Sequence, residues 1–364
     1  LTNLNEIGLH IKKEFKNLEE GDRENLALWR KFRELSISEF EKIYKMFDIK
    51  FDEFTSESGT NNYLEKTLKE LKEKKLSRKS QGALVVHLKK YGLGTAIIQK
   101  SDGTSIYCLR DIAEAIRRHK KYNFEKMIYE VGQEQTMHFQ QVFKILELMG
   151  YGWAKNCVHV KHGLYLGKDK KKFSTRKGKT ADLNEIIDIT EKYAQKEISK
   201  RFPELGQKEL KERALKVALA SIFYGDLKNN RETNIIFDPK SFVSFEGNTG
   251  PYILYSYARA SSILKKTKTK DKFSVPKKLE DKERDLFKSL TDFPEVALKA
   301  FKNYNPSIIA NYIYSICKTF NEFYHAHPVI GSDEEPFRLA LIESFRQVLR
   351  NSCNLLGIKL LEEM

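Results

Sequence analysis

The sequence predicts a fold class of α/β plus all-α, in which an α/β region is preceded and followed by helices. Three observations support this prediction. Apolar residues recur at three- and four-residue spacing in residues 1–75. Short apolar runs alternate with helical patterns in residues 81–180, and helical spacing resumes from about residue 182 to the end. Because strand, helix and strand follow one another over short connections, we expect a parallel sheet in the middle region.

Composition bounds the classes of protein to consider. The 364 residues suggest two or three domains, and a hydrophobic fraction of 40% is enough for packed cores. Lysine and arginine outnumber acidic residues 65 to 50, giving a net charge of +15. This excess favours a polyanionic partner, nucleic acid first, although a lysine-rich source would also produce it.

Three further features concern compartment and completeness. The four cysteines lack Cys-x-x-Cys spacing, so neither a metal site nor a disulfide framework is predicted, and reduced cytoplasmic thiols fit best. No apolar run approaches the roughly 18 residues of a membrane span, and no signal peptide is evident. The chain begins at Leu1 within helical periodicity, which indicates an internal start in a longer protein.

The middle region contains alternating short elements. The predicted elements are, in order, a helix over Tyr63–Lys75, apolar runs at Ala83–Val86 and Thr95–Ile98, a hairpin turn at Ser101–Thr104, a helix over Asp111–His119, a strand over Met127–Val131, a helix over Gln135–Met149 and a strand over Val158–Leu166. Ligands of parallel sheets bind beyond the carboxyl ends of the strands. Two polar segments lie there, the Gly132–Gln135 turn and the loop that follows Leu166.

The composition of the loop Lys172–Gly178 is suited to binding a polyphosphate. It combines small hydroxyl residues, cations and a closing glycine within a basic run. Short loops of this composition are also common as solvated surface. Phosphate binding and plain surface therefore both remain open from the loop alone.

The segment around Asp111 presents a carboxylate and an aromatic residue close together. Tyr107 lies four residues before Asp111, and a second acid is available at Glu57. A planar guanidinium with several donors is best held by carboxylates, so the segment suits a cationic substrate. The alternative is that Asp111 caps the start of a helix, a position that aspartate favours.

The segment Gly132–His138 follows a predicted strand. Glycine at a strand end allows a ligand to approach the backbone, and the glutamine and histidine that follow can contact a polar substrate or an adenine edge. An ordinary strand-to-helix turn with a structural histidine explains the same residues.

A third segment places aromatic residues on one helical face. Pro251 fits a first helical position, and Tyr252, Tyr255 and Arg259 then share a face at i, i+3 and i+7. Tyrosine rings beside arginine can stack the unpaired bases of RNA. The alternative is an aromatic stripe that packs into a core.

Four motifs resemble those of arginyl-tRNA synthetases of class I and occur in the order of that family. They are Asp52 with Glu57-Ser58, Ser101–Thr104 with Tyr107 and Arg110–Ala113, Val131-Gly132 with Glu134-Gln135 and His138, and the KMSKS-like Ser174–Gly178. The segments Asp226–Arg231 and Glu246–Tyr252, and the ending from Asn354 to Met364, also resemble the family. The resemblance covers essentially the whole chain.

The resemblance implies a fold and a domain order. It implies half of a Rossmann-like parallel sheet followed by a helical anticodon-binding bundle. The implied domains are a helical connecting insertion over residues 1–80, the second half of the catalytic domain over residues 81–180, a helical stem-contact segment over residues 181–240 and the anticodon-binding domain over residues 241–364.

The resemblance also implies an activity. ATP with Mg²⁺ and L-arginine would give arginyl-adenylate and diphosphate, and arginine would then pass to its tRNA, in a cytoplasmic monomer without a tightly bound cofactor. The implied site residues are Glu57, Tyr107, Asp111 and Gln135 for arginine, Gly132, Glu134, His138 and Lys172 for ATP, Ser174, Arg176 and Lys177 for catalysis, and Tyr252, Tyr255, Arg259 and Met364 for the anticodon.

Two departures from the family pattern leave an alternative open. The HIGH motif of class I synthetases is absent from this sequence, and Thr175 stands where the class pattern has its second lysine. The alternative is a tRNA-binding module without catalysis. A His-x-Gly-His element encoded before Leu1 would favour the enzyme, and a start codon there would favour the binding module. A basic helical adaptor would explain the charge but not the ordered motifs.

Overall fold

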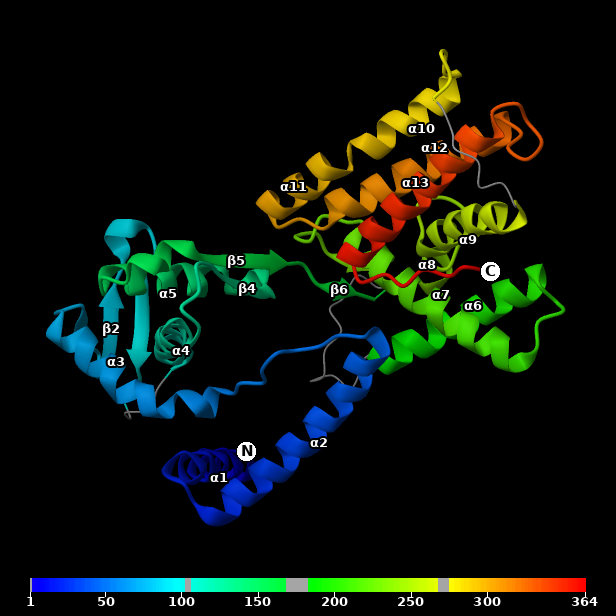
Figure 1. Ribbon diagram of the computed structural model, residues 1–364. Coiled ribbons are helices and arrows are strands. Elements are labelled where there is room, and N and C mark those ends of the chain that lie inside the picture. The colour runs from blue at the N-terminus through cyan, green and yellow to red at the C-terminus, as the bar shows by residue number, and fades with distance from the viewer. Residues whose placement is uncertain (1, 102–105, 168–182, 268–274) are drawn as a thin grey trace. The chain divides into compact units, whose positions relative to one another are not determined.

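The computed structural model describes residues 2–101, 106–167, 183–267 and 275–364, and these form two compact units, Leu1–Phe54 and Thr55–Met364 (Figure 1). The first unit consists of α1 (Thr2–Glu20) and α2 (Arg23–Phe47). Asp22 caps α2 by accepting a hydrogen bond from the backbone N–H of Asn25 at 2.9 Å. Asp48, in the left-handed region with a φ of 56°, ends the helix. The helices expected at the start of the chain are confirmed.

The second unit begins with an α/β part (Figure 1). Its elements are the 3₁₀ turn η1 (Glu57–Thr60), α3 (Asn61–Glu73), an antiparallel sheet of β1 (Ser77–Ser80), β2 (Ala83–His87) and β3 (Thr95–Gln99), then α4 (Tyr107–Tyr122), β4 (Met127–Gly132), the turn η3 (Gln133–Gln135), α5 (Thr136–Leu148) and β5 (Cys157–His162). The parallel sheet is confirmed, because β4 pairs with β5 in parallel from Met127↔Cys157 to Gly132↔His162.

Two predicted boundaries in this part are wrong, and the predicted hairpin turn is only partly described. The backbone N–H of Ile106 donates to the carbonyl oxygen of Ile98 at 3.4 Å, but Ile106 directly precedes α4 and residues 102–105 lie outside the described residues. Helix α4 starts at Tyr107, four residues before the predicted start at Asp111. The strand predicted over Val158–Leu166 is divided into β5 and β6 (Tyr165–Leu166), and β6 pairs in parallel with β7 (Ile235–Ile236).

One hydrophobic core holds the α/β part together. Helix α4 contacts α3, α5 and β3, and its apolar face is fully buried at Leu109 and Ile112. Helix α5 contributes Val142 and Ile145, which are also fully buried in the same cluster. The polar residues at the amino-terminal ends of α4 and α5 therefore belong to helices whose positions are set by this shared core.

The remainder of the second unit is helical apart from the short strand β7. Its helices are α6 (Leu183–Arg201), α7 (Gln207–Leu227), α8 (Pro239–Phe242), α9 (Gly250–Lys266), α10 (Asp281–Thr291), α11 (Phe293–Asn303), α12 (Ser307–Ala326) and α13 (Glu335–Leu355). They enclose a second core, in which the rings of Phe320 and Phe345 stack with centroids 4.1 Å apart. Among the described residues, every helix is too short or too polar to cross a membrane.

Gly250 allows α9 to start against the backbone of α7. A Cβ atom at this position would lie 2.6 Å from the carbonyl oxygen of Ala220. We expect Gly250→Ala to lower the free energy of unfolding by about 1–3 kcal/mol, because backbone atoms must shift to admit the methyl group. Denaturant melts followed by circular dichroism measure this loss. Gly152→Ala is the control, because a Cβ there meets nothing within 4 Å, and an equal loss in both variants would contradict the prediction.

Candidate functional site

Helix α4 presents two of the predicted arginine-binding residues on its first two turns. Tyr107 is the first residue of the helix, and its side chain is 69% exposed. Ile106 occupies the cap position, and Asp111 lies inside the helix. The alternative in which Asp111 caps the start of the helix is therefore wrong.

The carboxylate of Asp111 contacts the imidazole of His138. The distance between Asp111 Oδ2 and His138 Nε2 is 2.6 Å, and the side chains are 35% and 23% exposed. His138 lies on the first turn of α5, so the contact joins the amino-terminal ends of two helices. Beneath it, burial and then the charge of Asp111 raise the pKa of the Cys108 thiol to about 12. The structure thus brings together one residue predicted for arginine and one predicted for ATP.

The turn that carries Glu57 lies against α4. Helix α4 contacts η1, and Arg110 donates from Nη1 to Asn61 Oδ1 at 3.0 Å, just after that turn. The backbone of Glu57 is thereby held near the helix of Tyr107 and Asp111, although its side chain lies outside the part of the chain that the structure describes.

The Gly132–Gln135 segment lies at the carboxyl end of β4, as the sequence predicts. Gly132 is buried, and a Cβ atom there would lie 2.5 Å from Glu134 Oε2. The turn is closed by Thr136, whose hydroxyl donates to the carbonyl oxygen of Gln133 at 2.6 Å. Gln135 makes no side-chain capping hydrogen bond among the described residues, and both Glu134 and Gln135 are exposed. Their side chains can therefore meet a ligand.

The predicted phosphate loop lies outside the described residues. This applies to Lys172, Ser174, Arg176 and Lys177, all of which fall within residues 168–182. In the chain the loop follows β6, which ends at Leu166.

A cavity of about 570 Å³ lies beside β6. Its lining includes Glu130, His162, Tyr165, Asp226 and Arg231. Burial raises the pKa of the Asp226 carboxyl, while the hydrogen bond from Tyr165 and the charge of His162 oppose that rise. The sequence did not predict a polar cavity here, because its lining residues come from segments far apart in the chain, from Glu130 to Pro306.

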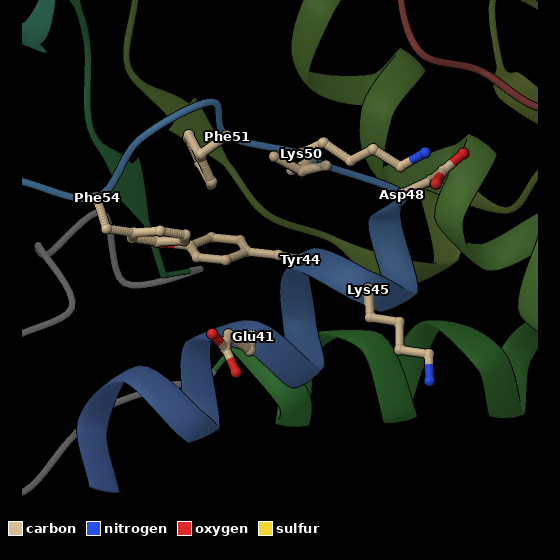
Figure 2. Close-up of a pocket in the computed structure, with 8 residues that line it drawn as sticks. Glu41, Tyr44, Lys45, Asp48, Lys50, Phe51 and Phe54 are labelled. Carbon is tan, nitrogen blue, oxygen red and sulfur yellow. The ribbon is translucent and has the colours of Figure 1, made fainter. Parts of the chain in front are cut away.

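A separate hollow lies in the first unit. It has a volume of about 470 Å³ and is lined by Glu41, Tyr44, Lys45, Asp48, Ile49, Lys50, Phe51 and Phe54. Figure 2 shows it at the end of α2. The ring centroids of Tyr44 and Phe51 are 4.8 Å apart, and those of Phe51 and Phe54 are 5.4 Å apart. Lys45 points away from these rings. The predicted site residues that the structure describes lie elsewhere.

The predicted anticodon residues of α9 divide into buried and exposed positions. Tyr252 is half-buried against the helical core, and its hydroxyl accepts a hydrogen bond from Asn321 Nδ2 at 2.9 Å. Tyr255 is 39% exposed, and the Arg259 guanidinium lies 4.7 Å from the centroid of its ring. Met364 is half-buried and packs against the same core. The alternative that this aromatic stripe packs into a core is therefore correct for Tyr252 but not for Tyr255.

Tyr324 on α12 completes this surface and was missed in the sequence. The Arg259 guanidinium lies 5.2 Å from the centroid of the Tyr324 ring, so it stands between two tyrosines (Tyr255 and Tyr324). Asn321, on the same helix as Tyr324, accepts a hydrogen bond from Arg259 Nη1. The sequence offered one signal for Tyr324, which is its position beside Phe320 and Phe323 in an otherwise apolar helical stripe. Exposed tyrosine rings beside an arginine are suited to stack nucleobases.

Comparison with known proteins assigns both parts of the chain. Residues 4–239 match the family described as tRNA synthetases class I (R), catalytic domain, and residues 253–364 match the DALR anticodon binding domain. The arginine–tRNA ligase of Clostridium perfringens is 42% identical over 356 residues, covering 96% of this chain and 62% of the relative. That of Clostridium botulinum strain Alaska E43 is 44% identical over 354 residues, with the same coverage.

Solved structures of other proteins support the same assignment. The arginyl-tRNA synthetase of Plasmodium falciparum superposes with a TM-score of 0.85 at 26% identity, covering 100% of this chain and 63% of that one. The synthetase of Thermus thermophilus shares the fold with a TM-score of 0.80 at 24% identity, covering 98% of this chain and 69% of that one. The chain spans about 62% of the length of the curated relatives named above. With a catalytic-domain match over most of its length and relatives above 40% identity, the chain belongs to the class I arginyl-tRNA synthetase family.

Proposed function

We propose that this protein ligates L-arginine to its tRNA through arginyl-adenylate, using ATP with Mg²⁺ as a substrate. The observation that carries the proposal is the placement of Asp111, a partly exposed carboxylate beside the exposed Tyr107 and near the η1 turn. Carboxylates in such a position suit a planar guanidinium, and lysine cannot satisfy the same fork geometry. The activity named for the relatives is the ligation of arginine to tRNA.

The proposed roles follow the order of the chain. Glu57 and Asp111 hold the guanidinium, and Tyr107 and Gln135 complete the arginine pocket. Gly132 and Glu134 lie at the ATP side, where the absence of a Cβ at Gly132 leaves room for the folded-back Glu134 side chain. Lys172, Ser174, Arg176 and Lys177 stabilise charge on the phosphates, as cations and hydroxyls do in transition states of this kind.

We further propose the domain boundaries and the cellular setting. Residues 1–80 form the connecting insertion, residues 81–180 the second half of the catalytic domain, residues 181–240 the stem-contact segment and residues 241–364 the anticodon-binding domain. The protein acts as a cytoplasmic monomer whose partner is tRNA.

The surface of Tyr255, Arg259 and Tyr324 gives a prediction for tRNA binding. We expect Tyr324→Ala to raise the KM for tRNA about tenfold, because a base–aromatic stack is worth about 1–3 kcal/mol. Tyr324→Phe keeps the ring and should leave KM within about twofold. Steady-state aminoacylation measures both, and equal effects of the two variants would show that the hydroxyl, not the ring, matters.

A charging assay tests the function. Protein expressed from the complete reading frame that encodes this chain is incubated with total tRNA, ATP and each amino acid in turn. Arginine should be charged, with lysine lower by at least about a thousandfold, because a site that hydrogen-bonds its substrate strongly rejects analogues lacking those groups. Charging of another amino acid at comparable efficiency would overturn the proposal. tRNA binding without charging of any amino acid would favour the binding module.

A further inference from the structure

The contact between Asp111 and His138 has the geometry of a strong hydrogen bond. At 2.6 Å, the separation of His138 Nε2 and Asp111 Oδ2 lies at the short end for a nitrogen donor and a carboxylate. An ionised carboxylate only accepts, so His138 donates from Nε2. The two residues are 27 positions apart in the chain and lie on different helices.

The imidazole is held in place by its surroundings. The ring of His138 meets the ring of Phe139 edge to face, with centroids 5.2 Å apart, and Phe139 itself is buried. His138 is 23% exposed, so its ring has limited freedom to leave the carboxylate. A fixed donor on one carboxylate oxygen selects one orientation of the Asp111 side chain.

The contact between Asp111 and His138 is not needed to hold α4 and α5 together. Leu109 and Ile112 of α4 and Val142 and Ile145 of α5 already share a fully buried core. A partly exposed ion pair at the rim of that core adds little stability. The main consequence of the hydrogen bond is that it orients the Asp111 carboxylate.

The pair leaves Asp111 able to bind a cation. Each carboxylate oxygen has two acceptor sites, so one hydrogen bond from His138 leaves both oxygens able to accept from a guanidinium. A carboxylate fixed beforehand binds more tightly than a freely rotating one, because its rotational entropy is already lost.

We propose that His138 is a positioning residue for arginine recognition, which fixes the Asp111 carboxylate in the orientation that receives the guanidinium. This inference rests on the proposed function, and it assigns to His138 a role in arginine binding in place of contact with adenosine. His138 acts through Asp111 and does not itself touch the reacting atoms.

Kinetics separate the two roles of His138. In the protein from the complete reading frame, His138→Leu should raise the KM for arginine about tenfold, the worth of one charged hydrogen bond, and leave the KM for ATP within about twofold. His138→Gln, whose amide can reach the carboxylate, should restore most of the loss. Gln140→Leu is the control for an apolar substitution on the same helix. A rise confined to the KM for ATP would overturn the proposal.

A double-mutant cycle tests whether His138 acts through Asp111. In an Asp111→Asn background, His138→Leu should change the KM for arginine by less than about twofold, because the group that it positions is already lost. Multiplicative effects of the two substitutions would show that His138 acts independently and would contradict the proposal.

A spectroscopic measurement separates this inference from the proposed function. Long-range ¹H–¹⁵N spectra of the chain should show His138 with its proton on Nε2, and Asp111→Asn should shift that signal, which is assigned from its loss in His138→Gln. An unshifted signal would overturn the contact and with it the inference. A shifted signal in a protein that charges no arginine would confirm the contact but refute the proposed function, on which the inference rests.

Discussion

Asp111→Asn is expected to raise the KM for arginine about 30- to 100-fold and to leave the KM for ATP within about threefold. Truncating one partner of a buried charge pair costs about 2–5 kcal/mol, and the lower end applies because the Asp111 side chain is 35% exposed. Asparagine preserves the size of the side chain but removes the negative charge that the guanidinium requires. Arginine-dependent ATP–diphosphate exchange, with tRNA present, measures both constants.

The matched control for this prediction is Glu125→Gln, which removes an exposed carboxylate between α4 and β4. It should leave both constants within about twofold. Equal increases in the KM for arginine and for ATP in Asp111→Asn would indicate a structural role for Asp111 and contradict arginine recognition.

Arg259→Ala is expected to weaken tRNA binding about 10- to 100-fold. The substitution removes the guanidinium from between Tyr255 and Tyr324 together with its hydrogen bond to Asn321. The expected loss corresponds to about 1.4–2.7 kcal/mol, within the roughly 1–3 kcal/mol of one base stack. Filter binding with the cognate tRNA measures the dissociation constant.

Two comparisons define what Arg259 does. Arg259→Lys keeps the charge but lacks the planar fork, so it should recover only part of the affinity. Lys265→Ala, at the end of the same helix, removes an exposed cation paired with Glu363 and should cost less than about threefold. Two results would show that Arg259 contributes only nonspecific charge. One is a loss of tRNA affinity in Lys265→Ala as large as that in Arg259→Ala. The other is an equal loss in Arg259→Ala for the cognate tRNA and for a tRNA with an altered anticodon.

The elements that the sequence predicted well are those with strong local patterns. The strand predicted over Met127–Val131 is confirmed as β4, which ends at Gly132, and its side chains alternate between buried and exposed from Met127 to Glu130. The start of α4 was missed because Ile106, rather than a serine or aspartate, occupies its cap position. Asp111, the polar residue that resembled a helix cap, instead contacts His138.

The contacts that the sequence could not predict are those between distant segments. The pairing of Asp111 with His138 depends on how α4 and α5 pack on their common core, which local periodicity does not determine. The same holds for Tyr324, which reaches Arg259 from another helix. Motif order identified most candidate residues, whereas their partners required the tertiary structure.

Binding of arginine and citrulline tests the central claim most directly. Citrulline has nearly the same shape but carries a neutral urea in place of the guanidinium, so the comparison isolates the charge that Asp111 is proposed to meet. Calorimetry on the protein from the complete reading frame, with tRNA present, should show arginine binding at least about a hundredfold more tightly, as expected when a buried charge pair is lost. In Asp111→Asn this preference should fall by at least about tenfold, because only the Glu57 carboxylate then remains to meet the charge. Equal binding of the two ligands by the unsubstituted protein, or an undiminished preference in Asp111→Asn, would contradict the account.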